Sequence, residues 1–213
     1  MKNEILRALA ALALALSAST LGSCTSLEST RDGPAWTAVE FSASRGPIED
    51  EHVPHSADDV ESFYASFLIG EEGTAELGRP AGFALELGLG VGAAGAETVP
   101  GLPVDFKFVQ VHAGARYYLD LGEEWGDVVQ PYVGALAAWR ESELSDASGS
   151  GFDSIDSSGV GFVGRAGIDF QVGGEAALGV GWQYASGFEL DDGMGAEVDV
   201  SEGGPFVAVR WAF

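Results

Sequence analysis

The sequence predicts an all-β protein, an eight-stranded antiparallel up-and-down β-barrel whose strands span a membrane. Three observations support this fold class: an export signal at the start of the chain, about eight segments that alternate with period two, and one face of those segments that is nearly neutral. The neutrality is informative because the 213 residues contain 10 Lys and Arg against 33 Asp and Glu, a formal net charge of -23. Such a charge repels phosphate backbones, so nucleic acid is excluded as a partner.

The composition argues against a disordered or disulfide-bonded chain. Apolar residues make up 46% and aromatic residues 10% of the sequence, more than a disordered acidic chain would contain. The length allows one sizeable core, and the single cysteine cannot form an internal disulfide. The fold therefore depends on burial and backbone hydrogen bonds.

Residues 1–23 are predicted to be a signal peptide of the lipoprotein type. Lys2 and Arg7 precede an apolar run over residues 8–16, which is shorter than the ~20 residues that a membrane-spanning helix needs. Leu21-Gly22-Ser23-Cys24 is similar to the lipobox of bacterial lipoproteins, which implies cleavage before Cys24 and lipid attachment to its thiol. The alternative is an ordinary signal peptide cut in Ala- and Ser-rich sequence beside an unmodified cysteine. Residues 24–33 then form a short linker, and residues 34–213 form the barrel.

Eight strands are predicted from period-two alternation. They cover residues 34–43, 60–70, 81–92, 104–120, 129–140, 158–172, 175–186 and 205–213. The links between them alternate in length, with the first, third, fifth and seventh longer, and most acidic residues fall in these long links, Glu202 among them. Long loops at one end and short turns at the other are typical of a transmembrane barrel with both chain ends in the periplasm.

The two faces of the strands distinguish a barrel from a soluble sandwich. In the last strand Val207, Val209, Trp211 and Phe213 share one face and Arg210 lies on the other, which fits either fold. Across all strands, the less apolar face collects four arginines and three acids, and we expect these to form a polar network in the lumen: Glu40, Glu86, Arg116, Arg140, Arg165, Asp169 and Arg210. A solvated face in so acidic a chain would be rich in Asp and Glu, whereas an enclosed lumen requires charge balance. A soluble, lipoprotein-tethered β domain remains the main non-membrane alternative.

Four segments carry a resemblance to a known family. From about Ala81 onward the chain resembles small outer-membrane β-barrel proteins of the OmpA/OmpX kind, through 115–119 (ARYYL), 130–134 (QPYVG), 161–167 (GFVGRAG) and 209–213 (VRWAF). The resemblance implies location in the outer membrane of a Gram-negative-type bacterium, with outer-membrane lipid as the surrounding partner. It also implies that Val209, Trp211 and Phe213 form the C-terminal signal read by the barrel-insertion machinery.

No catalytic, cofactor or metal site is predicted. Gly90 to Gly95 match a dinucleotide fingerprint, but Pro100 and Pro103 follow instead of the required helix. His52 and His55 lack a third metal ligand at a fixed spacing, and only loose binding of divalent cations at the acidic loops is expected. The order of motifs also resembles lipid A deacylases, but Tyr184 stands where that family carries its catalytic histidine, two residues before Ser186. Tyrosine is a poor general base near neutral pH.

The predicted function is that of a non-enzymatic outer-membrane protein with a structural or surface-interaction role, a salt-bridged lumen and acidic extracellular loops. The alternatives are a small pore or carrier in the same membrane and a lipid A deacylase-like barrel that has lost its catalytic histidine.

Overall fold

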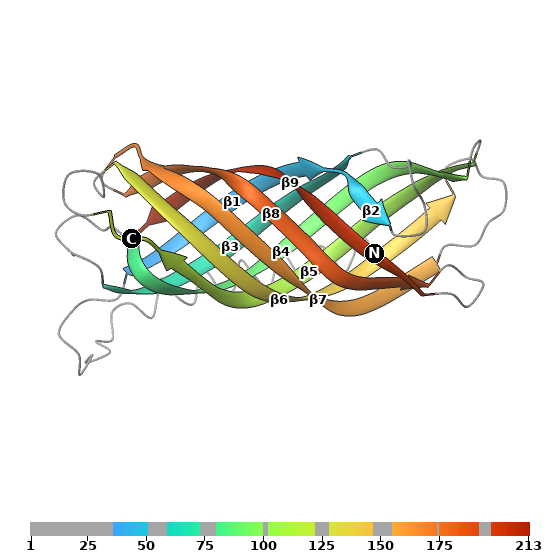
Figure 1. The fold of residues 1–213 in the computed structure, drawn as a ribbon, viewed down its shortest axis with the longest axis horizontal. Coiled ribbons are helices and arrows are strands. Elements are labelled where there is room, and N and C mark those ends of the chain that lie inside the picture. The colour runs from blue at the N-terminus through green and yellow to red at the C-terminus, as the bar shows by residue number, and fades with distance from the viewer. Residues whose placement is uncertain are drawn as a thin grey trace. The chain divides into compact units, whose positions relative to one another are not determined.

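The computed structural model is a closed antiparallel β-barrel, which confirms the predicted fold class (Figure 1). It describes residues 36–50, 59–72, 80–99, 102–121, 128–146, 155–173, 175–191 and 197–213. These residues contain nine strands: β1 (Trp36–Gly46), β2 (Ile48–Asp50), β3 (Val60–Glu72), β4 (Pro80–Val99), β5 (Leu102–Tyr118), β6 (Val129–Asp146), β7 (Ile155–Gln171), β8 (Ala176–Asp191) and β9 (Glu197–Ala212). The predicted signal peptide, Cys24 and the linker 24–33 lie outside the described residues.

The ring closes between its first and last strands. From β3 to β9 each strand pairs antiparallel with the next, β1 pairs with β3, and both β1 and β2 pair with β9. Pro47 separates β1 from β2, so these two act as one interrupted strand of the barrel, and the ring has eight strands as predicted. Closure gives every strand of the ring a paired neighbour on both sides, which a barrel in lipid requires.

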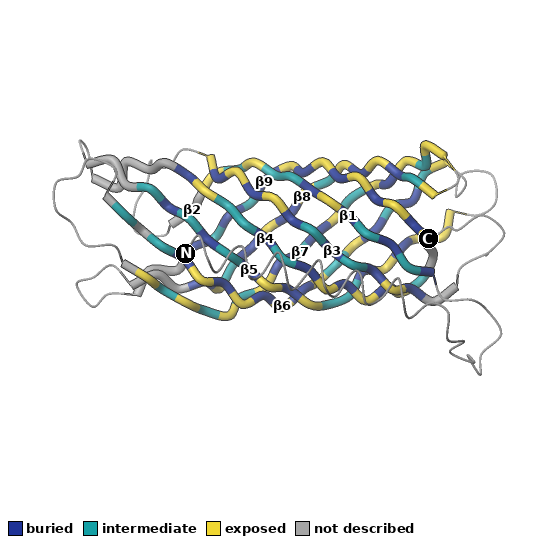
Figure 2. Tube along the Cα trace, turned by 180° about the vertical axis from the view of Figure 1, so that it is seen from behind, coloured by how far each residue is buried: buried dark blue, intermediate teal, exposed yellow. Residues whose placement is uncertain are grey.

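Alternation along each strand separates an outer face from an inner face (Figure 2). On β4, Leu85 and Leu87 are 66% and 58% exposed, whereas Glu86 between them is 2% exposed. On β9, Val207, Val209, Trp211 and Phe213 are exposed and Arg210 is buried. The apolar residues therefore point outward and the polar residues inward, the reverse of a soluble β protein and the arrangement of a transmembrane barrel.

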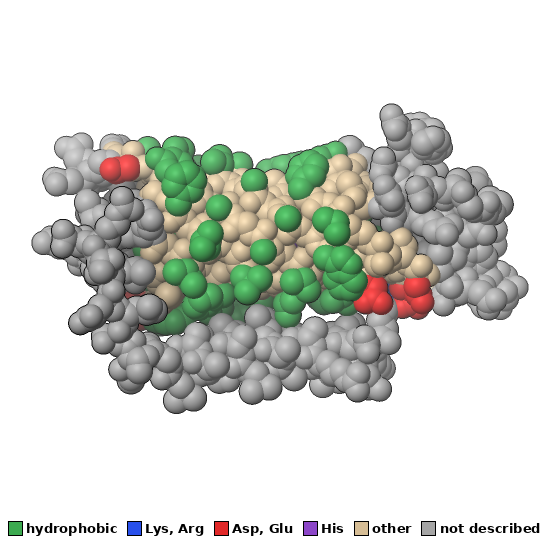
Figure 3. Space-filling model, turned by 90° about the horizontal axis from the view of Figure 1, so that it is seen from below, with side chains coloured by type: hydrophobic (Ala, Val, Ile, Leu, Met, Phe, Trp, Pro, Cys, Tyr) green, Lys and Arg blue, Asp and Glu red, His purple; other side chains and the backbone are tan. Residues whose placement is uncertain are grey.

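The outward apolar side chains form a belt around the strands. Hydrophobic side chains are spread over the middle of the face in Figure 3, and the Asp and Glu side chains visible in this view lie toward its two ends. On β4 the belt runs from Phe83 to Val91, a height of about 20 Å for a tilted strand, similar to the ~25 Å apolar band of outer-membrane barrels. Among the described residues there is no helix long and apolar enough to cross a membrane.

Both ends of the barrel sequence meet at one end of the molecule, which we name the terminal end. The backbone N–H of Phe213 donates to the carbonyl of Thr37 at 3.0 Å, and the Thr37 hydroxyl donates to the Phe213 carbonyl at 2.8 Å. The opposite end, where β4 meets β5 and β8 meets β9, is named the distal end.

The predicted strands are all present, but they are longer than predicted at the distal end. Only two residues separate β4 from β5, the shortest link in the barrel, so the predicted alternation of long and short links is absent. Many acids expected in loops, such as Glu141 and Glu143, lie in strands instead. The reason is that backbone pairing needs no apolar alternation. The strands therefore continue into water beyond the point where the sequence pattern stops.

A β-bulge in β8 changes the alternation near the distal end. The β8–β9 register shifts between Ala185 and Phe188, and Gly187 has φ of 81°, a left-handed conformation that favours glycine. As a result Ala185 and Phe188 both point inward although they are three residues apart.

We predict that a charge in the apolar belt destabilises the barrel strongly. Leu87→Arg places a cation against lipid and should lower the free energy of unfolding by about 2–4 kcal/mol. Ala93→Arg is the control, since Ala93 is exposed on the same strand but lies beside Glu61 and Lys107 beyond the belt, and about 0–1 kcal/mol is expected. Urea unfolding in phospholipid vesicles measures both variants. If Leu87→Arg and Ala93→Arg lowered the free energy of unfolding equally, the apolar belt would not lie where we place it.

Candidate functional site

The inner face of the barrel brings together four arginines and four carboxylates, the complete set of charged Arg, Lys, Asp and Glu side chains that are buried within the described residues. The eight residues are Arg116, Arg140, Arg165, Arg210, Glu40, Glu86, Asp169 and Glu202. Their formal charges cancel. This balance contrasts with the -23 of the whole chain and is what a group of charges removed from water requires.

The central layer is built around Arg116. Its two terminal nitrogens donate to the two carboxylate oxygens of Glu40, each at 2.6 Å, and its Nε donates to Glu86 at 2.5 Å. Arg165 donates to Glu86 at 3.1 Å and lies 3.6 Å from Glu40. These contacts join β1, β4, β5 and β7, so the layer crosses the lumen instead of following one wall.

Uncharged polar groups complete the central layer. The Ser66 hydroxyl donates to Glu86 at 2.7 Å, and its oxygen lies 3.0 Å from Nε2 of His112. His112 has room because Gly88 on the neighbouring strand has no side chain, since a Cβ there would collide with the imidazole. His112 is buried, and its contacts are those of a structural member of the network.

Nearer the terminal end, Arg210 forms a second layer. It is paired with Asp169 on β7, donates to the Tyr118 hydroxyl at 3.1 Å and donates to the Gln130 side chain at 3.0 Å. The Tyr118 ring contacts the rings of Trp36 and Tyr132, with centroid separations of 5.8 and 5.3 Å. Aromatic rings and an ion pair together fill this end of the lumen.

Nearer the distal end, Arg140 forms a third layer. Its Nη2 donates to Glu202 at 2.7 Å and to Gln110 at 2.8 Å. Its guanidinium carbon lies 3.9 Å from the centroid of the Phe108 ring and 3.9 Å from that of the Phe188 ring, so it makes a cation–π contact with each. Toward the distal end, Val60, Ala94, Phe106 and Phe108 form a buried apolar cluster.

The structure brings all seven residues of the predicted lumen network into contacts with one another or with Glu202. The alternation of the sequence did not identify Glu202, which was assigned to an acidic loop and is instead a buried strand residue that pairs with Arg140. The sequence did contain the information needed to place it, because Glu202 is an even number of residues from Arg210 on β9 and therefore shares its inward face. Gly203-Gly204-Pro205 obscured the pattern by interrupting the apolar alternation.

The residues of the other candidate sites lie elsewhere. Tyr184 points outward and is exposed, and Ser186 is opposite Phe162 at the bulge of β8. His52 and His55 lie outside the described residues. No group of three or more His, Cys, Asp and Glu suited to a metal ion occurs in the described strands and links.

Comparison with solved structures identifies the architecture. Neisserial surface protein A is 16% identical with a TM-score of 0.53, and the match covers 84% of this chain and 97% of that one. Ail, the attachment invasion locus protein of Yersinia pestis, is 15% identical with a TM-score of 0.51, over 86% of this chain and all of that one. The structure of Ail in complex with the heparin analogue sucrose octasulfate is 16% identical with a TM-score of 0.50, and the match covers 86% of this chain and all of that one.

The fold is that of a small transmembrane outer-membrane β-barrel. Neither a protein-family model nor a curated protein sequence matches this chain. The barrel is therefore shared with these proteins at the level of architecture.

We predict that removal of a lumen arginine destabilises the barrel far more than removal of a surface arginine. Arg116→Ala leaves Glu40 and Glu86 without their main partner, and a loss of about 3–5 kcal/mol in the free energy of unfolding is expected. Arg45→Ala is the control, because Arg45 is 66% exposed in its pairing with Asp59 and should cost about 0–1 kcal/mol. The measurement is the urea midpoint of the folded band on gels without boiling. Similar midpoints for the two variants would disprove a stabilising network.

Proposed function

We propose that this chain is a non-enzymatic outer-membrane protein, a member of the OmpA/OmpX kind of barrel, in a Gram-negative-type bacterium. Its role is structural or in surface interaction. The lumen is closed to ions along its axis, the terminal end faces the periplasm, and the distal end is at the cell surface. Val209, Trp211 and Phe213 serve as the signal for barrel insertion, and Cys24 carries a lipid.

The observation that carries this proposal is the contact of Arg116 with Glu40 and Glu86 from two other strands. An eight-stranded ring is just wide enough for its side chains to fill. Charge pairs that cross such a ring occupy the path an ion would take. The aromatic layers around Arg210 and Arg140 support closure on both sides of the central layer.

Closure predicts that the purified protein does not form a steady, large-conductance channel in planar bilayers. Folding is verified first by migration at a different apparent mass before and after boiling. The matched variant is Glu141→Ala, which removes an exposed charge outside the lumen and should also give no steady conductance. Steady conductance from the wild-type protein would overturn closure and favour the alternative of a small pore or carrier.

The partners proposed for the distal end are divalent cations and other cationic groups. An acidic collar, defined by the outward residues Asp59, Glu61, Asp105, Glu141, Glu143 and Asp156, lies at this end along β3, β5, β6 and β7, and Arg45 and Lys107 are the described outward bases there. Glu143 and Asp156 are directly opposite each other across β6 and β7, a like-charge pair. Lys107 is opposite Glu143 across β5 and β6, so one base serves both acids and a bound cation would reduce the remaining repulsion. The collar has the wrong sign for a sulfated ligand such as the heparin analogue bound by Ail.

We predict that neutralising the collar weakens calcium binding. The triple variant Glu141→Gln, Glu143→Gln, Asp156→Asn should bind Ca²⁺ more weakly than the wild type in isothermal titration, and the difference should shrink at high salt because exposed charges are screened. Glu175→Gln at the terminal end is the control and should leave binding unchanged. Unchanged binding in the triple variant would exclude the collar as the cation site.

A further inference from the structure

Strand β7 is paired over different lengths on its two sides. Its ladder with β6 continues toward the distal end as far as Ile155 opposite Leu144. Its ladder with β8 ends earlier, at Phe162 opposite Ser186. Within the part of the chain that the structure describes, the stretch 155–161 of β7 therefore has ladder pairs with β6 alone. Such a stretch is an edge strand, and its backbone groups on the unpaired side can bind another chain.

The bulge in β8 explains why the two strands separate. Gly187 has φ of 81°, and the next residue, Phe188, points inward with its ring centroid 3.9 Å from the guanidinium carbon of Arg140. Beyond the bulge β8 stays paired with β9, from Phe188 opposite Val200 onward. A bulge bends its strand and increases the local twist. The distal part of β8 therefore follows β9 and leaves the edge of β7.

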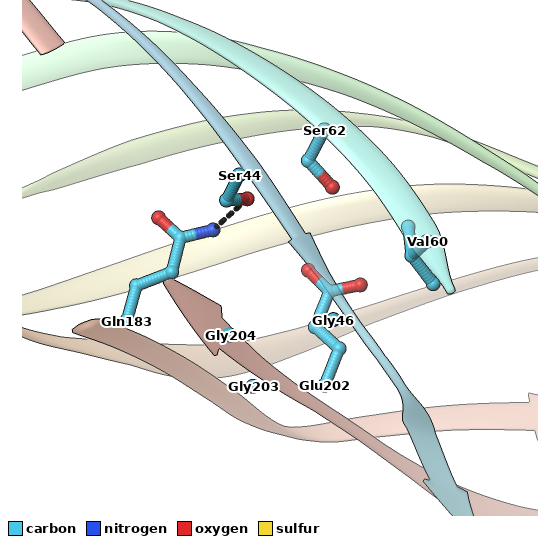
Figure 4. Close-up of a pocket in the computed structure, with 8 residues that line it drawn as sticks. All are labelled: Ser44, Gly46, Val60, Ser62, Gln183, Glu202, Gly203 and Gly204. Atoms are coloured by element: carbon cyan, nitrogen blue, oxygen red, sulfur yellow. Dashed lines mark hydrogen bonds between the residues drawn. The ribbon is translucent and has the colours of Figure 1, made fainter. Parts of the chain in front are cut away.

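The seam between β1 and β9, by comparison, stays covered. Gly46 lies against the backbone of Gly203 and Gly204, and Gln183 on β8 donates to Ser44 on β1 at 2.7 Å (Figure 4). Strand β2 then pairs with β9 beyond the seam. Both sides of β9 are occupied there, in contrast to the edge of β7.

Alternate residues of β7 direct their backbone groups to the unpaired side. The N–H of Gln171 donates to the carbonyl of Val128, beside β6, and the N–H of Val172 donates to the carbonyl of Ala176 on β8. Successive residues of a strand pair to opposite sides. Odd-numbered residues of β7 therefore pair with β6 and even-numbered residues face β8. In the stretch 155–161 it is the even-numbered residues whose N–H and C=O groups point to the edge.

The side chains beside the edge define what can bind there. The even-numbered residues of the stretch have outward, exposed side chains: Asp156, Ser158 and Val160. Their direct neighbours on β6 are, in the same order, Glu143, Glu141 and Trp139. Val160 is 70% exposed. The outer face along the edge is thus acidic at its distal end and apolar next to the belt.

A second copy of this chain does not fit the edge. Two barrels in one membrane would be related by rotation about the membrane normal, so their tilted β7 strands would cross instead of lying side by side. Pairing would also bring two acidic faces together, which is unfavourable for like charges on neighbouring strands. The charge of the face instead complements a basic partner.

We propose that the distal edge of β7 is a docking site for an extended basic segment of a partner protein, which adds to the sheet as an antiparallel strand. Backbone hydrogen bonds to the edge provide affinity, and alternate side chains provide specificity. The segment carries an apolar residue opposite Val160, then basic residues opposite Ser158 and Asp156, with one residue between each. The inference rests on the proposed function, which places the distal end at the cell surface, and it names the class of partner.

Peptide binding to the wild-type protein in micelles tests the site. The probe is the fluorescently labelled peptide TVTKTKT, which has this pattern, and binding is followed by fluorescence anisotropy. One analogue carries backbone N-methyl groups on the valine and both lysines, whose N–H groups would face β7. A second carries them on the intervening threonines, whose N–H groups would face away. The first should bind at least about tenfold more weakly than the parent, because several ladder hydrogen bonds are lost together, and the second should bind like the parent.

The two analogues have the same charge and the same side chains, so they separate strand addition from attraction by the collar. Absence of binding by the parent peptide would overturn the proposal. Equal binding of the two analogues would also overturn it. Calcium binding by the collar is measured independently, so the docking site and the proposed function can fail separately.

A pair of variants tests the same edge from the side of the protein. Ser158→Pro removes an N–H from the edge but keeps the ladder with β6, since proline is tolerated where the N–H points away from the sheet. Ser158→Ala keeps that N–H and is the control. Ser158→Pro should weaken binding of the parent peptide at least about tenfold, and Ser158→Ala should leave it unchanged. Unchanged binding by Ser158→Pro, with folding verified by migration before and after boiling, would contradict the site.

Backbone hydrogen exchange on the wild-type protein removes any dependence on variant folding. Followed by nuclear magnetic resonance in micelles, the amides of Ser158 and Val160 should be less protected than those of Gly159 and Gly161, which pair with β6. The parent peptide should raise the protection of Ser158 and Val160. Equal protection of all of these amides before the peptide is added would show that the edge is already covered and would overturn the proposal.

Discussion

The closing ladder between β1 and β9 is the interaction on which the rest of this structure depends. In lipid, an unpaired backbone N–H or C=O has no water to bind, so a sheet with a free edge is not stable. Seven residue pairs, from Ala38 opposite Ala212 to Ser44 opposite Phe206, remove that edge. Closure also brings the two ends of the barrel sequence together at Thr37 and Phe213. Once the ring is closed, each strand must present alternate residues to lipid and to an enclosed interior.

The interior then imposes its own constraint, because a ring of eight strands has little room and excludes most water. The four arginines are each matched by a carboxylate, and aromatic rings fill the space between them. Glycine occurs where a neighbouring ring needs the volume: a Cβ at Gly90 would come within 2.5 Å of the Tyr64 ring. Charge balance and volume are thus satisfied by the same alternating face, which is why the inner face differs so much from the acidic strand ends.

The low identity to structures of the same architecture has a physical explanation. The barrel requires an alternating pattern, balanced interior charge and a closed ladder, and many sequences meet these requirements. Neisserial surface protein A and Ail share the ring with this chain at 16% and 15% identity. Fold alone does not carry a function from one such protein to another, and the acidic distal end gives this chain a surface of its own.

Much of this protein could be predicted from alternation, because the side chains of a strand point to opposite faces with period two whatever the strand pairs with. That local rule was sufficient to predict the eight strands, their two faces and seven of the eight buried charged residues, among them Arg116 and Asp169. It failed at Glu202, where two glycines and a proline interrupt the apolar pattern, and at Phe188, where a bulge changes the parity. It also ended the strands too early, because backbone pairing continues beyond the apolar belt.

The sequence by itself determined which side chains point into the barrel. Only the tertiary structure decided which of them meet, as when Arg116 pairs with Glu40 from 76 residues away, and where the closing ladder loses its pairs between Ser44 and Ile48. The physical reason is that direction is a property of a single strand, whereas contacts across the lumen depend on the register of every ladder in the ring.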